Sequence, residues 1–323
     1  MKQPPRKLNY EGQPRRLGVE IEFAALSVAE SANKVRSLFG GTPEEIDPHR
    51  FYIRNTSLGD FVCELDTRVA HRGAGRAPLG RGGAWDDFRR RLHAVLGDIS
   101  SLVMPCEIVC PPVTLGKLEQ LDHLVSVLAE TGAEGTRANP FFAFGAQLNP
   151  ELADRSTEWI LSVLKAYLLT SDWLRAIMSI DFTRRLVAYA DPFPKEYAAM
   201  VVAPDYWPSQ DRMIDDYITA NPTRNRELDM LPLFAWLDEA RVRNVVTDPR
   251  VKARPTFHYR LPDANLDDAN WSITAEWDRW VIVERLAEQR RTLDTMGAAY
   301  RANRQRFIPE DWALRSSEWL VML

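Results

Sequence analysis

Carboxylates recur at every second position in two short apolar stretches of the sequence. GVEIEF carries Glu20 and Glu22, and FVCELDTR carries Glu64 and Asp66. In an extended strand, alternate side chains point to opposite faces, so each pair shares one face while its apolar neighbours share the other. Carboxylates held close together repel one another unless a cation lies between them, and Mg²⁺ and Mn²⁺ prefer such oxygen ligands. The two stretches therefore predict strands with carboxylates gathered on one face, the ligand type that a divalent-metal site needs.

Three further stretches show the same alternation. CEIVCP sets Glu107 against apolar neighbours, FGAQLNP does so with Gln147 and Asn149, and FHYRLP with His258 and Arg260. If the five strands form one sheet, these groups share a polar face that can bind metal ions or phosphate. An ordinary solvent-facing strand also alternates, so the prediction depends on the coincidence of five strands. One Mg²⁺ uses only a few protein carboxylates, so the set favours more than one ion.

The elements that must position these side chains follow from the same periodicities. Alternating residues predict strands over 16–26, 50–54, 59–69, 105–112, 140–150 and 256–262. Apolar residues at helical spacing predict helices over 85–101, 115–131, 155–180, 275–305 and 309–321. Pro111 and Pro112 are expected to stop their strand, because proline cannot donate to a ladder. Strands and helices do not alternate strictly, which favours an α+β fold over a doubly wound sheet.

Composition and charge set the class of protein. A net charge of -4 over 323 residues argues against a nucleic-acid partner. Three cysteines without CxxC spacing argue against a disulfide framework and favour a reducing compartment. With no apolar leader and no apolar run of about 20 residues, we expect a cytoplasmic protein without a membrane partner. Residues 1–15, polar and proline-rich, predict a flexible arm before a single domain over 16–323 that ends in a helical part from about 275.

The order of these motifs resembles a known family. LGVEIEF, ELDTR, EIVCPP, FGAQLNP and FHYRLP, in that order, resemble the amidoligase family of the carboxylate–amine ligase superfamily, which includes glutamine synthetase and glutamate–cysteine ligase. NPTRNRELDMLPLF and WDRWVIVERLAE resemble it as well, so the resemblance covers roughly residues 16–290. It implies a glutamine synthetase-like catalytic fold: a curved, mainly antiparallel sheet, packed by helices, whose polar concave face binds ATP and two or three Mg²⁺ or Mn²⁺ ions.

The resemblance also implies an activity and roles for residues. Such enzymes phosphorylate a carboxylate with ATP and let an amine attack the acyl phosphate, so the partners would be an acid and an amine on an amino acid, peptide or related small molecule. The implied metal ligands are Glu20, Glu22, Glu64, Glu107 and His258. The implied ATP-binding residues are Gln147, Asn149, Arg224, Arg226 and Arg260, and the implied catalytic residues are Glu64, Asp66 and Arg260.

Two departures from the superfamily pattern leave alternatives open. The strand that often reads His-Val-His carries Gln147 and Asn149 here, and the Glu-x-Arg motif begins with His258. One interpretation is that an imidazole has moved from one strand to the other. A degenerate, non-catalytic binding member is the second, and a metal-dependent hydrolase that uses the same carboxylates is the third.

The motif NPTRNRELD has two interpretations of its own. Arg224, Arg226 and Asp229 either contact nucleotide or a substrate carboxylate, or form salt bridges at the start of a helix. The oligomeric state has no signal in the sequence.

Overall fold

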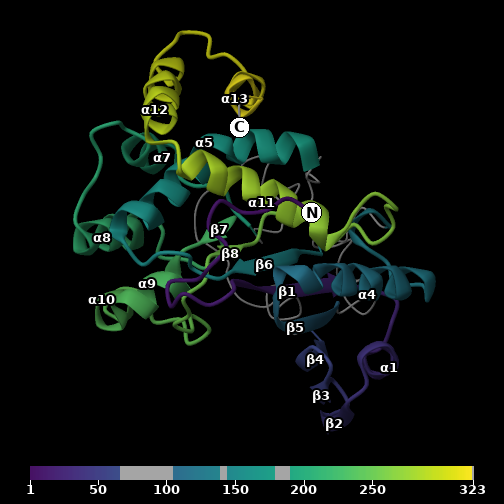
Figure 1. The fold of residues 1–323 in the computed structure, drawn as a ribbon. Helices are drawn as coiled ribbons and strands as arrows, with labels where there is room; N and C mark the ends of the chain where they lie inside the picture. The colour runs from purple at the N-terminus through teal and green to yellow at the C-terminus, as the bar shows by residue number, and fades with distance from the viewer. Residues whose placement is uncertain (66–104, 139–143, 179–189, 322–323) are drawn as a thin grey trace, which may run out of the picture.

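The computed structural model describes residues 1–65, 105–138, 144–178 and 190–321. Eight strands in this part of the chain form one open, curved antiparallel sheet in the order β2-β3-β4-β5-β1-β6-β8-β7 (Figure 1). They are β1 (Arg16–Phe23), β2 (Thr42–Asp47), β3 (Arg50–Thr56), β4 (Gly59–Leu65), β5 (Cys106–Thr114), β6 (Ala146–Pro150), β7 (Leu228–Asp229) and β8 (His258–Tyr259). With the helices described below, this confirms the predicted α+β fold. Asp66 and the helix expected over 85–101 lie outside the described residues.

The strand β1 lies at the centre of the sheet, between β5 and β6. Its apolar residues Leu17, Val19, Ile21 and Phe23 are fully buried, and they belong to one continuous core cluster. The predicted alternation therefore holds here: one face of the sheet is the core, and the other carries the polar groups.

The strand β5 corrects one prediction. It runs through Pro111 and Pro112 to Thr114, although the two prolines were expected to end it. The reason is a bulge: β1 pairs Leu17 with Val113 and Val19 with Cys110, so both prolines lie opposite one residue of β1. At a bulge the ladder is interrupted, and a residue without an N–H is tolerated there.

Helices cover the apolar face of the sheet. The helical segments are α1 (Val28–Phe39), η1 (Leu115–Lys117), α4 (Leu118–Glu130), η2 (Thr136–Ala138), α5 (Thr157–Met178), α7 (Lys195–Val201), α8 (Gln210–Ala220), α9 (Leu231–Leu237), α10 (Glu239–Arg243), α11 (Ile273–Ala287), α12 (Arg290–Arg304) and α13 (Trp312–Leu320). Phe39 of α1 stacks on Phe61 of β4, and Tyr259 of β8 meets Tyr167 of α5 and Trp280 of α11. These contacts place α1, α5 and α11 on the apolar face, opposite the polar groups.

The helices α12 and α13 form a second layer on α5 (Figure 1). We predicted one helix over 275–305, but the structure breaks it into α11 and α12 at Gln289, whose ψ of 73° is not helical. Residues 288–292 are all polar, so no apolar side chain in this stretch anchors a continuous helix to the core. The helix predicted over 309–321 is present as α13.

Residues 1–15, expected to be an arm, lie along α11. The Arg6 guanidinium forms an ion pair with Glu288, and Arg15 forms a buried, bidentate ion pair with Glu284, at 2.6 and 2.8 Å. The Trp277 indole donates a hydrogen bond to the carbonyl of Lys2. The N-terminal residues therefore contact the helix that packs behind β8.

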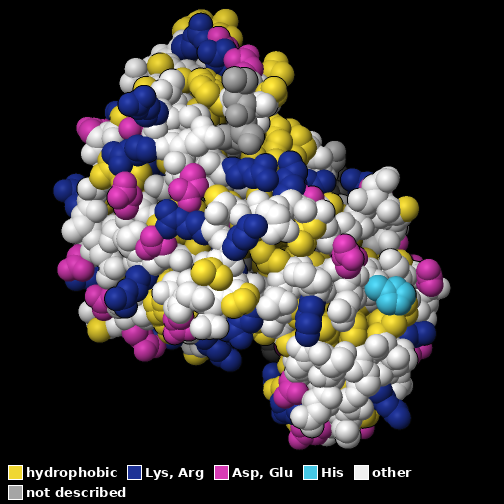
Figure 2. Space-filling model, in the orientation of Figure 1, with side chains coloured by type: hydrophobic (Ala, Val, Ile, Leu, Met, Phe, Trp, Pro, Cys, Tyr) yellow, Lys and Arg dark blue, Asp and Glu magenta, His cyan; other side chains and the backbone are white. Residues whose placement is uncertain are grey.

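The surface carries charges of both signs. On the face shown in Figure 2, Lys and Arg side chains are interspersed with Asp and Glu side chains. Within the described segments, no helix combines the length and apolar character that a bilayer-spanning helix needs. The three cysteines are free and buried, and burial raises the pKa of the Cys106 thiol to about 11.

Candidate functional site

Three glutamates lie side by side across neighbouring strands on the polar face. Glu22 of β1 is directly opposite Glu107 of β5, and Glu107 is directly opposite Glu64 of β4. Residues paired in this way have their Cβ atoms about 5 Å apart, and like charges at such positions repel. Glu22 and Glu107 are buried. We call Glu22, Glu107 and Glu64 the acidic end of the polar face.

The surroundings of these glutamates are polar. The Gly145 N–H donates a hydrogen bond of 2.9 Å to Glu22 Oε2. The guanidinium of Arg50, from β3, lies 3.1 Å from Glu64 Oε2, and Glu64 is the most exposed of the three. Arg50 was not among the predicted site residues, although alternation in RFYIR places it on the polar face. Glu64 is therefore the carboxylate that solvent and a ligand can reach most easily.

A group of amides adjoins the acidic end. Glu20 is paired with Gln147 across β1 and β6, and its Oε1 accepts hydrogen bonds from Gln147 Nε2 at 3.3 Å and from Asn149 Nδ2 at 3.0 Å. Gly18 is opposite Asn149, and a Cβ atom there would come within 3.3 Å of the Asn149 Cβ. The close packing of Gly18 therefore fixes Asn149, and the two amides fix Glu20.

His258 lies against the same amides. Gln147 Nε2 is 3.1 Å from His258 Nδ1. Because the amide nitrogen donates, Nδ1 accepts, and the neutral ring carries its proton on Nε2. Burial, with Arg254, Arg260 and Arg224 nearby, holds the pKa of His258 well below its usual value. The ring is therefore neutral at pH 7, and Nε2, buried without a hydrogen-bond partner among the described residues, is a donor.

Two arginines lie beside His258. Arg260 follows β8, and its Nη1 donates to the carbonyl of Arg224 at 2.9 Å. Burial and the charge of Arg260 lower the pKa of Arg224, and its buried Nε has no hydrogen-bond partner among the described residues. Two like charges held together in a buried place favour an anionic ligand. We call Arg224, Arg260 and His258 the basic end of the polar face.

Asp229 of β7 lies opposite His258. It is almost fully buried; its Oδ1 accepts from the N–H of Leu231, and its Oδ2 has no partner in the described part of the chain. Burial raises the pKa of Asp229 to about 6, against the opposing charges of Arg260 and Arg224. Asp229 therefore changes its charge close to neutral pH.

Comparison with known proteins identifies the family. The sequence matches the family described as "Putative amidoligase enzyme" over residues 13–282, which is most of the chain. The chain belongs to this amidoligase family. No curated protein and no solved structure matches it significantly. Membership confirms the resemblance of the motifs and indicates an enzyme of the ligase kind.

The donor set of this amidoligase family member suits a divalent cation by type. The acidic end offers carboxylate oxygens in neighbouring positions, the hard ligands that Mg²⁺ and Mn²⁺ take. Among the residues that the structure describes, no three His, Cys, Asp or Glu side chains converge closely enough to hold an ion as they stand. His258, with its Nδ1 facing the Gln147 amide, presents an N–H at Nε2 as it stands, and its role as a metal ligand stays a prediction.

The predicted site residues are brought together along one face, with two exceptions. Asp66 lies outside the described residues. Arg226 points elsewhere: its Nη1 donates to the carbonyl of Pro192 at 2.7 Å. In the motif NPTRNRELD, Glu227 forms the salt bridge, and both of its carboxylate oxygens accept hydrogen bonds from Arg175. The guanidinium of Arg224 is therefore left for another partner. Arg254, whose charge helps to lower the pKa of His258, was not predicted, because it lies in an irregular segment without periodicity.

Proposed function

We propose that this amidoligase family member is an ATP-dependent carboxylate–amine ligase that joins an acid to an amine through an acyl phosphate. The observation that carries this proposal is the division of one polar face into an acidic end and a basic end, with the amides of Gln147 and Asn149 between them. An ATP–metal complex has the matching distribution of charge, cationic at the metal and anionic at the phosphates.

The basic end would hold phosphate oxygens. Arginine binds phosphate through charge-assisted and often bidentate hydrogen bonds, and Arg224 has a buried Nε that lacks a partner within the described segments. The Nε2–H of His258 would donate to a phosphate oxygen, in place of the role as metal ligand expected from the sequence. An anion here would also relieve the repulsion between Arg224 and Arg260.

The acidic end would hold divalent cations through Glu22, Glu107 and Glu64. A bound cation supplies charge neutralisation for the phosphates, and it offsets the repulsion between glutamates on neighbouring strands. Glu64 would have to exchange its contact with Arg50 for the cation. Glu20, held by two amides, would position the neighbouring carboxylates and contribute one oxygen at most.

The reaction needs positioning more than a nucleophilic side chain. A carboxylate oxygen of the acid attacks the γ-phosphorus of ATP, the bond to the bridging oxygen breaks, and ADP leaves. The amine nitrogen then attacks the acyl carbon, phosphate leaves with the electrons of the C–O bond, and the amine loses a proton. In both steps Arg224, Arg260 and His258 would hold the phosphoryl oxygens at a site where burial strengthens each contact.

Hydroxylamine as the amine tests this proposal without knowledge of the natural amine. The purified chain is incubated with ATP, Mg²⁺, hydroxylamine and a panel of amino acids and short peptides, and hydroxamates and ADP are measured by mass spectrometry. We expect a hydroxamate for at least one acid, formed one-to-one with ADP and absent without ATP or in the Glu22→Gln variant. A panel in which no acid gives a hydroxamate, together with ATP-independent cleavage of a phosphodiester, would support the hydrolase instead.

One observation favours a second candidate, a family member that binds without catalysis. Glu20, expected as a metal ligand, accepts hydrogen bonds from Gln147 and Asn149, which stand where superfamily members often carry histidines. Stabilisation of the chain by Mg-ATP in a thermal melt, with no hydroxamate from any acid, would support this candidate.

A further inference from the structure

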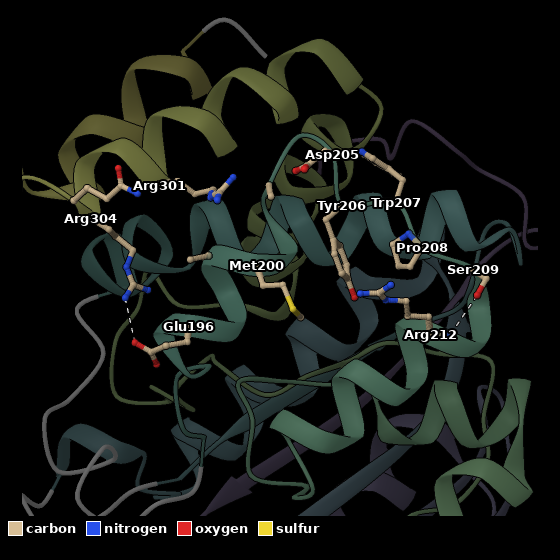
Figure 3. Close-up of a pocket in the computed structure, with 13 residues that line it drawn as sticks. Glu196, Met200, Asp205, Tyr206, Trp207, Pro208, Ser209, Arg212, Arg301 and Arg304 are labelled. Atoms are coloured by element: carbon tan, nitrogen blue, oxygen red, sulfur yellow. Dashed lines mark hydrogen bonds and ion pairs between the residues drawn. The ribbon is translucent and has the colours of Figure 1, made fainter.

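A pocket of about 900 Å³ lies away from the polar face, among α7, α8, α12 and the segment between α7 and α8 (Figure 3). Its lining shares no residue with the acidic or the basic end. Arg301 and Arg304 come from α12, which lies beyond residue 282, where the family match ends. The pocket is therefore built jointly by the region that matches the family and by a helix beyond it.

The walls of the pocket combine apolar side chains, three arginines and two carboxylates, Glu196 and Asp205. In Figure 3, Arg301 extends from one side and Arg212 from the other, with Met200 and Tyr206 between them. Glu196 forms an ion pair with Arg304 at 3.3 Å, so these two charges offset each other. Arg301 has no hydrogen bond or ion pair with any described residue, and Arg212 only a long contact of 3.5 Å with Asp216. The two arginines are therefore left for a ligand with more than one negative charge.

The apolar wall is rigid. The Trp207 indole donates a hydrogen bond of 2.9 Å to the carbonyl of Pro204. The guanidinium carbon of Arg290 lies 3.4 Å from the centroid of the Trp207 ring, and Lys165 Nζ lies 4.2 Å from it. Lys165 is almost fully buried and donates to the carbonyl of Ala203, a residue of the pocket lining. A preformed wall of this kind reduces the entropy lost when a ligand binds. Lys165 behind it adds to the positive potential of the pocket, whereas the charge of Arg290 is offset by its ion pairs with Glu158 and Asp294.

We propose that this pocket binds an acidic peptide segment, with carboxylates on Arg301 and Arg212 and an apolar stretch on Met200 and Trp207. The volume is that of a typical ligand site and large enough for several residues. The arginines stand on different helices across an apolar floor, which suits carboxylates spaced along a peptide better than the compact charge of one phosphate. The N-terminal end of α8, at Ser209, adds the positive end of a helix dipole on the same side. Binding here needs none of the residues on the polar face.

Fluorescence anisotropy with a fluorescein-labelled tetraglutamate peptide tests the proposal. The full chain is titrated without ATP, and unlabelled tetraglutamate, tetraglutamine and inorganic phosphate serve as competitors. Arg301→Glu is compared with Arg291→Glu, a matched change on the same helix at an exposed position that does not line the pocket. Both positions are exposed, so both variants are expected to fold, which their melting curves check.

We expect saturable binding that only tetraglutamate competes away. Arg301→Glu should weaken it by roughly tenfold or more, since one charged hydrogen bond is lost and a repulsion is added, whereas Arg291→Glu should change it by less than about twofold. Equal effects of the two variants, no saturable binding, or equal competition by phosphate would overturn the proposal. The Glu22→Gln variant should bind the peptide as tightly as the parent does. Peptide binding can therefore be confirmed or refuted separately from the ligase proposal.

Discussion

The acidic and basic ends of one polar face are built in different ways. The acidic end stands on the long, regular ladders of β1, β4 and β5, where register alone sets Glu22, Glu107 and Glu64 side by side. The basic end stands on β7 and β8, two residues each, and on irregular segments that carry Arg224 and Arg260. Alternation along a strand therefore places the carboxylates and His258 on the polar face, whereas the position of Arg224 depends on tertiary packing.

The charges at the two ends are balanced differently. Burial and the charge of Arg260 lower the pKa of Arg224, and the carboxyl of Asp229 interacts with both arginines. At the acidic end, Glu64 forms an ion pair with Arg50, and Glu107 lies directly opposite both Glu22 and Glu64. Neighbouring side chains of like charge favour a ligand of opposite charge. We expect substitutions at the acidic end to lower activity, and loss of one arginine to lower activity while it relieves a repulsion.

The largest effect is expected at the acidic end. Glu22→Gln removes a carboxylate charge but keeps the side-chain volume, and we expect hydroxamate formation to fall on the order of 10³-fold, since cation binding contributes several kcal/mol to such reactions. The rate is measured with saturating ATP and Mg²⁺. Glu45→Gln, on the exposed edge strand β2, is the matched control and should keep full activity. An active Glu22→Gln variant would remove Glu22 from the metal site.

The second effect concerns stability at Asp229, beside the basic end. The pKa of Asp229 is raised from 3.8 to about 6 in the folded chain, so the folded state binds the extra proton between these values. Below pH 4 the carboxyl is neutral in both the folded and the unfolded state and costs no stability. As the pH rises through about 6, Asp229 ionises in its buried place, and the free energy of unfolding falls. Asp229→Asn should therefore be more stable than the parent by roughly 3 kcal/mol at pH 7.5 and equal to it near pH 4.

Urea unfolding of the two proteins across pH 4–7.5 measures this difference. Asp205→Asn, at an exposed carboxylate, is the control and should follow the parent at each pH. A parent and Asp229→Asn variant with parallel curves would show that Arg224 and Arg260 already keep Asp229 charged.

The third prediction concerns Arg224, where a substitution should lower the activity and raise the stability of the folded chain. Arg224→Met keeps most of the volume and removes one of two neighbouring positive charges, so we expect kcat/KM for ATP to fall roughly 10- to 100-fold. The same change relieves repulsion with Arg260, so the melting temperature without nucleotide should rise by a few degrees. A lower melting temperature with unchanged activity would mean that Arg224 has a structural role instead.

The smallest effect is expected at the amides between the two ends. Asn149→Ala removes one hydrogen bond to Glu20 and should cost about 1 kcal/mol of folding free energy. Gly18→Ala places a Cβ 3.3 Å from that of Asn149 and should shift the asparagine by a few tenths of an ångström. Thermal melts measure both changes. Activity reduced more than tenfold by either variant would assign the amides a direct contact with substrate.

Alternation along the strands predicted the face for the acidic end, and for His258 and Arg260 of the basic end, for a physical reason. Alternation in GVEIEF and CEIVCP survives folding because a strand has a fixed period of two, so Glu22 and Glu107 could be assigned to one face. Register between strands, which makes them neighbours, is a tertiary property. The strand β2 was missed because it has no buried residue, and β7 because two residues carry no periodicity.

Other features of the structure differ from the prediction because they depend on contacts between segments that are distant in the sequence. The contact of Gln147 with His258 links β6 to β8, and only this pairing shows that His258 presents a donor. Likewise, the bulge that accommodates Pro111 and Pro112 depends on β1, which is far away in sequence. Nothing in residues 195–212 or 290–304 alone indicated a pocket, because its walls come from segments about 90 residues apart.

A crystal structure with Mn²⁺ and a non-hydrolysable ATP analogue tests the central claim most directly, because anomalous scattering identifies the manganese. We expect manganese at Glu22, Glu107 and Glu64, and the terminal phosphate in contact with Arg224 and Arg260. Manganese absent from the acidic end, or phosphates bound in the pocket between α8 and α12, would contradict the account.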